Sequence, residues 1–244
     1  MAKFSTKKSG ISNLFKKAAC AAALAASSFA QAGVINFESG FEASPILYAG
    51  GVVQTGEFWI QTYANGNTET TDLAGVIVDG STNEMCISGG CPVNNPTNYY
   101  AGLNDAYLYF GLDNGNKFHL GSLQASYIGA EGTTFPGVAG ALVIQGFNAL
   151  HQAVGNSQAI FLPGPTGGAF NFATYDLSPL SGYEFDYVRI FSYGCDFSGN
   201  CSRISGIGNM ALDNITTIPE PTSMALFGLG LIGLGALSRR RRSA

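Results

Sequence analysis

One stretch of the sequence has the glycine spacing of a nucleotide-binding loop. Gly228, Gly230 and Gly233 fit the pattern G-x-G-x-x-G, in which backbone amides at a helix N-terminus hold a pyrophosphate. Such a loop needs a preceding strand, a following helix and an acidic residue about 20 positions further on. Pro219 and Pro221 precede the glycines, and eleven residues follow Gly233. We therefore expect no dinucleotide site here.

Cysteines are the next residues with chemistry. Four of the five lie in two close pairs, Cys86 with Cys91 and Cys195 with Cys201. Thiols so placed can form disulfides or hold zinc, but zinc ribbons usually space their cysteines by roughly two to four residues. We expect two local disulfides that pin loops rather than hold the fold, because Ser, Gly and Asn in each loop allow tight closure. A zinc site is the alternative.

Catalytic motifs are missing from the sequence. It has no G-x-S-x-G, no H-E-x-x-H and no complete EF-hand loop. His119 and His151 are expected to be ordinary strand or loop residues rather than bases. We predict a non-enzymatic protein and nominate no catalytic residue. A secreted hydrolase remains an alternative, because folding can bring an acid–base pair together from distant positions.

Aromatic residues suggest binding, since exposed rings can stack on the apolar faces of sugars. Tyr99 and Tyr100 follow the Asn-rich segment "CPVNNPTN" and are our candidates for ligand binding. Trp59 and Tyr63 fall in one strand-like segment. We expect Trp59 to be buried, because the aromatic residues of a β-sandwich are usually in the core.

Residues 1–32 have the three parts of a secretory signal peptide. Five lysines are followed by an Ala-rich apolar stretch over residues 18–26 and by Ala30-Gln31-Ala32, which has the small residues of a cleavage site. Ala30 and Ala32 therefore predict cleavage after Ala32. Cys20 would leave with this peptide.

Residues 218–244 form a second distinctive end. Pro219, Glu220 and Pro221 precede an apolar segment, predicted as a helix over residues 222–238, and then come Arg239, Arg240, Arg241 and Arg242. The fourteen uninterrupted apolar and glycine residues at 224–237 span about 21 Å as a helix, whereas a membrane span usually takes about 20 residues. Four arginines should stay in the cytoplasm and leave the body outside. We expect a weak, transient inner-membrane anchor.

The two ends together resemble those of PEP-CTERM proteins, the substrates of exosortase. The segment "IPEPTSMALFGLGLIGLGALSRRRR" follows that family's pattern throughout. The resemblance implies that exosortase, an integral-membrane cysteine peptidase, recognises the tail and removes it around the PEP motif. It also implies delivery to the cell surface or beyond, in Gram-negative bacteria that make extracellular polysaccharide. It implies a route and no activity, because very different bodies carry this tail.

The body, residues 33–217, has a length that suits one domain. It holds three basic residues, Lys117, Arg189 and Arg203, against fifteen acidic ones, a formal net charge of −12. Such a body should repel nucleic acid and anionic membrane surfaces, so we expect neither as a partner. The charge favours solubility, with attraction of divalent cations as the alternative.

Short segments rich in Val, Ile, Phe and Tyr run through the body, separated by Gly, Asn, Asp and Pro. No stretch sustains a helical period over three turns. The pattern predicts an all-β fold, a single antiparallel β-sandwich. Residues 113–116, Asp-Asn-Gly-Asn, are read as a hairpin turn between "YLYFGL" and "KFHL".

The body also resembles the jelly-roll sandwich of many PEP-CTERM proteins and of carbohydrate-binding modules. The segments "VINFESGFE", "ALVIQGFNAL", "FNFATYDLSPLSGYEFDYVRI" and "MALDNITT" carry this resemblance. In those modules, acidic residues of the first and last strands often share a structural calcium ion. The resemblance places Glu38 and Asp213 at the corresponding positions, with Glu42 nearby, so a calcium site is one hypothesis and solvated strand-end acids are the other.

These observations predict an exported, exosortase-sorted protein of the cell surface or extracellular matrix, associated with exopolysaccharide. A specific carbohydrate-binding module and a secreted hydrolase are the two alternatives. The expected partners are exosortase during sorting and an exopolysaccharide afterwards. Apart from calcium, we expect no cofactor.

Overall fold

The structure is a computed structural model that describes residues 33–42, 44–64, 71–86, 89–130, 134–202 and 207–218. The predicted signal peptide with Ala30 and Ala32 lies outside the described residues. So do Pro219, Glu220 and Pro221, the predicted apolar helix and the four arginines that follow it. The described residues belong to one compact unit. No helix within the described ranges is long and apolar enough to cross a membrane.

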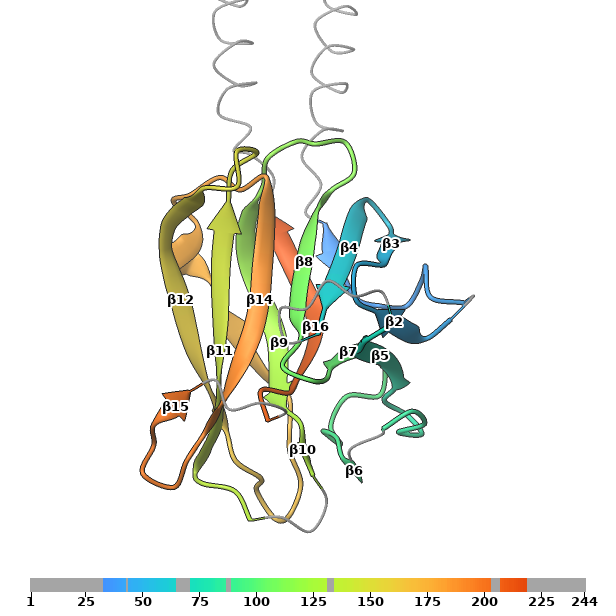
Figure 1. Cartoon of the computed structure of the whole chain (residues 1–244), viewed down its shortest axis with the longest axis vertical. Coiled ribbons are helices and arrows are strands. Elements are labelled where there is room, and N and C mark those ends of the chain that lie inside the picture. Colours follow the sequence, from blue (N-terminus) through green and yellow to red (C-terminus); the bar gives the residue numbers. More distant parts are fainter. Residues whose placement is uncertain are drawn as a thin grey trace, which may run out of the picture. The chain divides into compact units, whose positions relative to one another are not determined.

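Two antiparallel seven-stranded sheets make up the body (Figure 1) and confirm the all-β sandwich. The first, called here the β16 sheet, has the order β13 (Ala173–Asp176), β9 (His119–Tyr127), β16 (Met210–Ile218), β7 (Asn98–Gly102), β5 (Leu73–Asp79) and β2 (Ile46–Tyr48), with β1 (Val34–Ile35) on β16. The second, the β14 sheet, has the order β12 (Ala153–Pro163), β11 (Val138–Phe147), β14 (Tyr187–Cys195), β8 (Tyr107–Leu112), β4 (Phe58–Tyr63) and β3 (Val52–Thr55), with β15 (Cys201–Ser202) on β14.

Three short elements complete the described fold. Strands β6 (Gly89–Gly90) and β10 (Gly129–Ala130) pair with each other, and η1 (Ser178–Leu180) is a single turn of 3-10 helix. Strands β11 and β12 form a long hairpin whose register shifts between Ile144 and Gly146.

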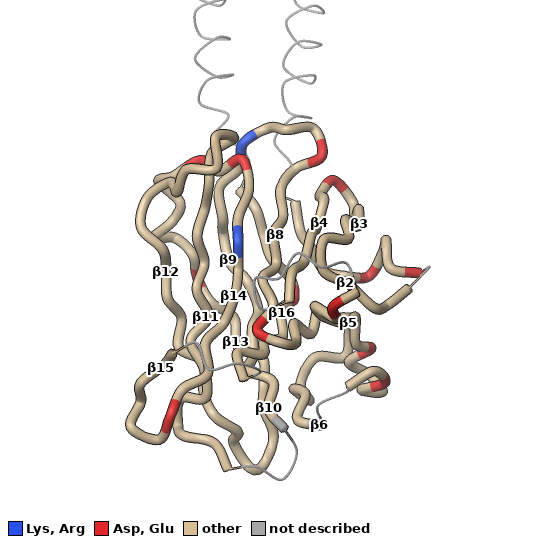
Figure 2. The backbone as a smooth tube through the Cα atoms, in the orientation of Figure 1, with Lys and Arg blue, Asp and Glu red and all other residues tan. Residues whose placement is uncertain are grey.

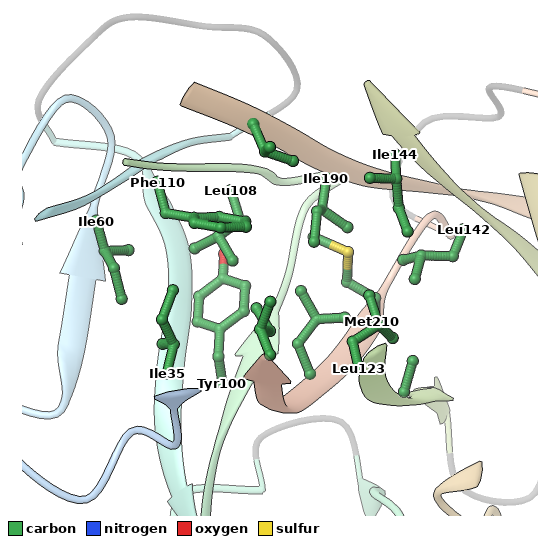
Figure 3. Close-up of a cluster of buried hydrophobic side chains, with 14 of the residues drawn as sticks. Ile35, Ile60, Tyr100, Leu108, Phe110, Leu123, Leu142, Ile144, Ile190 and Met210 are labelled. Atoms are coloured by element: carbon green, nitrogen blue, oxygen red, sulfur yellow. The ribbon is translucent and has the colours of Figure 1, made fainter. Parts of the chain in front are cut away.

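The main core lies between the two sheets. Alternation along β4 shows how the sequence builds it, because Phe58, Ile60 and Thr62 are buried while the residues between them are only half-buried. Figure 3 shows side chains of both sheets meeting in this core, with Ile60, Leu108, Ile144 and Ile190 from the β14 sheet and Tyr100, Leu123 and Met210 from the β16 sheet.

A second buried cluster covers the opposite face of the β16 sheet. It contains Val76 and Val78 of β5, Tyr99 of β7 and Ala211 of β16. Cys91 belongs to this cluster, and Cys86 and Phe172 pack against it, so the chain around these residues lies over the sheet. Asn94 fixes this cover, because its Oδ1 accepts a hydrogen bond from the Phe172 N–H and its Nδ2 donates to the Phe172 carbonyl. Strands β5 and β7 of the β16 sheet are therefore buried on both faces.

The turn over residues 113–116 corrects one prediction. Gly115 has a φ of +69°, as a tight turn requires, and Asn114 Oδ1 accepts a hydrogen bond from the Asn116 N–H. However, β8 and β9 on either side belong to different sheets, so this turn is no hairpin. Turn chemistry shows where the chain reverses, but partner choice depends on which sheet can bury each strand's apolar face.

Candidate functional site

The outer face of the β14 sheet carries rows of aromatic and polar side chains. Register places Gln61 opposite Tyr109, and Tyr109 opposite Arg189. The adjacent row on this face places Tyr63 opposite Tyr107, and Tyr107 opposite Phe191. Because their strand neighbours fill the core, these side chains point away from it.

A shallow depression of about 470 Å³ lies on this face. Its volume falls within the range of about 300–1,000 Å³ that small-ligand pockets occupy. Four tyrosines dominate the lining, and three polar side chains accompany them: Gln61, Tyr63, Tyr107, Tyr109, His151, Tyr187 and Arg189. We call this set the tyrosine depression.

Tyr187 sits among several rings of the face. Its ring centroid lies 6.3 Å from those of Trp59 and Tyr109. The hydroxyl is 2.9 Å from His151 Nδ1, which makes a hydrogen bond whose donor depends on the histidine tautomer. Burial and the neighbouring Tyr109 raise the pKa of the Tyr187 hydroxyl, while the charge of Arg189 opposes this rise. Tyr187 therefore stays a neutral hydrogen-bonding group at physiological pH.

The turn between β11 and β12 places His151 against Tyr187. Asn148 Oδ1 accepts hydrogen bonds from the N–H groups of Leu150 and Gln152, and the His151 N–H donates to the Asn148 carbonyl. Asp186 Oδ2 accepts from the Ala149 N–H and ties the turn to the residue before Tyr187. His151 adopts a φ of +60° here, a conformation that the surrounding bonds hold. Its placement is thus fixed by local structure.

Trp59 lies next to a glycine that makes room for it. Gly111 is its cross-strand partner on β8, and a Cβ added there would lie 2.8 Å from Trp59 Cζ2 and Nε1. Trp59 is half-buried on the outer face of the sheet. The prediction that it belongs to the core is wrong, because its position on β4 alternates with the core residues Phe58 and Ile60.

Arg189 is the cation of the tyrosine depression. Its Cζ lies 5.1 Å from the ring centroids of Phe147 and Phe191 and 5.6 Å from that of Tyr107. These distances fit cation–π contacts, which occur within about 6 Å. The rings therefore hold the guanidinium at the sheet surface.

Acidic residues of the described chain lie outside the lining of the tyrosine depression. Figure 2 shows blue at only two places in the described chain, one of them on β14, while red is more frequent and lies mostly towards strand ends and turns. The blue residues are Lys117 and Arg189, since Arg203 is not among the described residues. No Asp or Glu belongs to the described lining of the depression.

Tyr99 and Tyr100, the predicted ligand-binding residues, are both buried. Each is 0% exposed. The two residues are adjacent on β7, so their side chains point to opposite faces of the β16 sheet, and each face is covered at this strand. Tyr99 packs at 5.2 Å against Phe172 in the covered cluster, and Tyr100 stacks at 5.9 Å on Phe37 in the main core. Burial raises the pKa of both hydroxyls. Neither ring is available to a sugar, so the prediction is wrong.

The sequence does contain a signal for this site. In "FWIQTY", "YLYFGL" and "YVRIFSY", aromatic or polar residues alternate with aliphatic or aromatic core residues. Applied to β4, β8 and β14, this alternation selects the outward-facing residues Trp59, Gln61, Tyr63, Tyr107, Tyr109, Tyr187 and Arg189. The alternation does not show that these three strands are neighbours in one sheet.

Glu38 and Asp213, the predicted calcium ligands, hold the same stretch of chain. Asp213 is 0% exposed, and its Oδ2 accepts hydrogen bonds from Asn95 Nδ2 at 2.8 Å and Thr97 Oγ1 at 3.2 Å. Glu38 Oε1 accepts from the Asn98 N–H at 2.8 Å. Burial raises the pKa of Asp213, its hydrogen bonds partly offset this, and the charge of Glu38 adds a smaller rise.

These contacts do not indicate a calcium site at Glu38 and Asp213. Asp213 also accepts from the N–H and Nδ2 of Asn214, so N–H and O–H donors occupy both of its oxygens. No group of three or more His, Cys, Asp or Glu side chains in the described ranges is arranged to hold a metal ion. Calcium usually takes six to eight oxygens. The geometry fits acids that anchor a loop through hydrogen bonds, and the calcium site stays a prediction.

Both local disulfides are formed. Cys86 bonds to Cys91 in the cover of the β16 sheet, and Cys195 bonds to Cys201. The second pair joins directly opposed residues of β14 and β15. His119 is buried in β9, and its Nδ1 lies 2.8 Å from the Tyr183 carbonyl. It does not belong to the described lining of the depression, and its buried position in β9 fits the ordinary strand residue that the sequence predicts.

The C-terminal residues match a known protein-family model. The family model for the PEP-CTERM protein-sorting motif matches residues 217–242. The chain carries a PEP-CTERM sorting motif. With the two disulfides, this motif identifies an exported protein. The PEP-CTERM match begins at Thr217, so its first two residues are the last two of β16.

Solved structures resemble the body of this protein at low identity. A DUF4465 family protein from Bacteroides caccae is 13% identical, with a TM-score of 0.43 over 78% of this chain and 87% of that one. Another, from Bacteroides ovatus, is 11% identical, with a TM-score of 0.40 over 77% and 98%. The module CBM32-3 from a family 31 glycoside hydrolase of Clostridium perfringens is 8% identical, with a TM-score of 0.31 over 80% and 98%. Among curated proteins, none matches. Identities this low say nothing about what the chain binds.

Proposed function

We propose that this exported protein binds polysaccharide outside the cell through the tyrosine depression. The observation that carries the proposal is the gathering of Tyr63, Tyr107, Tyr109 and Tyr187 around one open depression on a sheet face. Over β5 and β7 of the β16 sheet the outer face is covered by the chain, so Tyr99 there is buried. On the β14 sheet the four tyrosines line a surface.

The composition of the depression suits a sugar. Tyrosine rings offer an apolar surface to the C–H face of a pyranose, while their hydroxyls reach its polar edge. Gln61 and His151 supply further hydrogen-bonding groups on the same surface. Gln61 Nε2 already donates to the Gly50 carbonyl, which fixes the amide and leaves its oxygen directed elsewhere. The face is therefore prepared for stacking and hydrogen bonding together.

The residues of the tyrosine depression do not indicate hydrolysis of a glycosidic bond. Glycoside hydrolysis ordinarily needs two carboxyl groups on either side of the scissile bond. The described lining of the tyrosine depression contains none. We therefore favour binding without hydrolysis at this depression.

The export route sets where binding occurs. We propose that the PEP-CTERM tail holds the protein briefly in the inner membrane and that an exosortase-type peptidase then removes it. The body is thereby delivered to the cell surface or the extracellular matrix. There its ligand is an exopolysaccharide, with the depression as the point of association.

The test is a glycan array followed by calorimetric titration of the best binder with residues 33–218, which contain both buried clusters. Tyr109→Ala and Tyr187→Ala should each weaken binding about tenfold, equivalent to about 1.4 kcal/mol. Phe161→Ala and Phe197→Ala are matched controls, because these rings are 62% and 71% exposed but lie outside the depression lining. Binding to no glycan, or equal losses in the controls, would reject the proposal.

A further inference from the structure

We propose that the polysaccharide bound at the tyrosine depression carries carboxylate groups and that Arg189 recognises them. This inference rests on the proposed function and names the chemical class of its ligand. The structure shows an arginine at the centre of a ring-lined surface, in a body where acidic residues far outnumber basic ones. No Asp or Glu accompanies this cation in the described lining of the depression.

Arg189 has no ion pair with any described carboxylate, and its buried Nε atom has no hydrogen-bond partner. Its direct strand neighbours are Tyr109 on β8 and Gln145 on β11, both uncharged. Gln145 Nε2 donates to the Gly146 and Val154 carbonyls, so this amide group is committed to the backbone. The hydrogen-bonding capacity of the guanidinium is therefore directed to the depression that it lines.

The aromatic contacts prepare Arg189 for an anion. Among the described residues, Phe147, Phe191 and Tyr107 lie 5.1 to 5.6 Å from the guanidinium carbon, and these ring contacts leave its two terminal Nη groups for a ligand, while Nε is buried. The planar fork of these N–H groups matches the two oxygens of a carboxylate. Because packing limits its rotamers, less conformational entropy is lost when the ligand binds.

The charge of the body makes this recognition selective. Its excess of acidic residues opposes the approach of any polyanion, but exposed charges are largely screened beyond about 8 Å at physiological ionic strength. Within that range the described lining supplies one positive charge and no negative one. A chain that combines carboxylates with pyranose faces gains both the arginine contact and the stacking, whereas a polyanion without sugar faces for the tyrosines gains too little to offset the repulsion.

The test compares polygalacturonate and alginate with the same polymers after reduction of their carboxyl groups to neutral alcohols. Binding is measured by calorimetry with residues 33–218. We expect the acidic form of at least one polymer to bind about tenfold tighter than its reduced form. Arg189→Gln should bring this ratio towards one, and Arg189→Lys should recover it only in part, because lysine keeps the charge but loses the fork. Lys117→Gln, which removes the other described cation away from the depression, should leave the ratio unchanged.

The outcomes separate the two proposals. If acidic and reduced polymers bind equally and Tyr187→Ala weakens both, polysaccharide binding stands and the carboxylate inference is wrong. An acidic preference that survives Arg189→Gln, or that Lys117→Gln removes equally, would also overturn the assignment to Arg189. Binding of no polymer by the wild-type body would reject both proposals. Thermal melting of each variant checks that loss of binding is not loss of fold.

Discussion

Tyr187 lies parallel to Phe147, with ring centroids 5.1 Å apart and an interplanar angle of 8°. The two residues are direct cross-strand partners on β14 and β11. Phe147 also lies beneath the guanidinium of Arg189. One ring thus supports both the tyrosine and the arginine of the proposed binding face.

Removing this support should weaken ligand binding. Phe147→Leu keeps an apolar side chain but loses the ring stack, and stacked aromatic pairs contribute about 0.5–1.5 kcal/mol. We expect polysaccharide affinity to fall roughly two- to tenfold in calorimetric titration. Phe161→Leu on β12 of the same sheet is the control, since it lies outside the depression. Equal affinity in both variants would show that Phe147 does not position Tyr187 and Arg189.

Gly111 should be intolerant of even a methyl group. An added Cβ would lie 2.8 Å from the Asp186 carbonyl oxygen as well as from the indole of Trp59. We expect Gly111→Ala to destabilise the fold by about 1–3 kcal/mol and to shift the fluorescence of Trp59, the protein's single tryptophan. Gly137→Ala is the control, because a Cβ there meets no atom within 4 Å. An unshifted emission spectrum with unchanged stability would contradict this packing.

Asp213 should make stability depend on pH. Burial raises its pKa above the unfolded value of 3.8, so the folded protein binds this proton more tightly than the unfolded chain. Its contribution to the free energy of unfolding is therefore full below 3.8 and is lost as the pH rises through the folded pKa.

Asn95→Ala tests whether Asn95 stabilises the ionised form of Asp213. The variant removes a hydrogen bond that stabilises the ionised carboxylate, so it should cost about 1–3 kcal/mol at pH 7 and less where Asp213 is protonated. Urea unfolding of wild type and variant across pH 3 to 7 measures the difference. A cost that grows on acidification would mean that Asp213 is not the group that Asn95 supports. Addition of calcium in the same assay tests the predicted metal site, which requires a clear stabilisation.

The two disulfides should stabilise loops rather than decide the fold. Their cysteines are only 5 and 6 positions apart, and chain entropy predicts about 2 kcal/mol for loops this short. Reduction, or the double variants Cys86→Ser/Cys91→Ser and Cys195→Ser/Cys201→Ser, should lower the melting temperature by several degrees and keep a cooperative transition. Loss of cooperative unfolding in either variant would show that the loops are part of the folding core.

The sorting motif can be tested in cells. The full chain and a form lacking residues 219–244 should differ in compartment and in processed size, since only the full chain carries the PEP-CTERM tail. Fractionation and blotting measure both. Delivery of both forms to the same compartment at the same size would contradict the route.

Local patterns predict the strands and both cysteine pairings well, because alternation and loop closure are properties of neighbouring residues. Tyr99 and Tyr100 show the limit of this reasoning. They stand beside a polar segment in the sequence, yet that segment is tied to Asp213 through Asn95 and Thr97, and β7 is hydrogen-bonded to β5 and β16. Which sheet face the chain covers depends on contacts across more than 100 positions, as between Asn95 and Asp213. For the same reason, the tyrosine depression follows from sheet order and not from any one segment.

The most direct measurement is a crystal structure of residues 33–218 with an oligosaccharide of the best-binding polysaccharide. We expect sugar rings stacked on Tyr109 or Tyr187, in the depression on β4, β8 and β14, with a carboxylate of the ligand within hydrogen-bond distance of the Arg189 guanidinium. An oligosaccharide bound at the covered face of the β16 sheet or at the connecting loops, with the tyrosine depression filled only by solvent, would contradict this expectation.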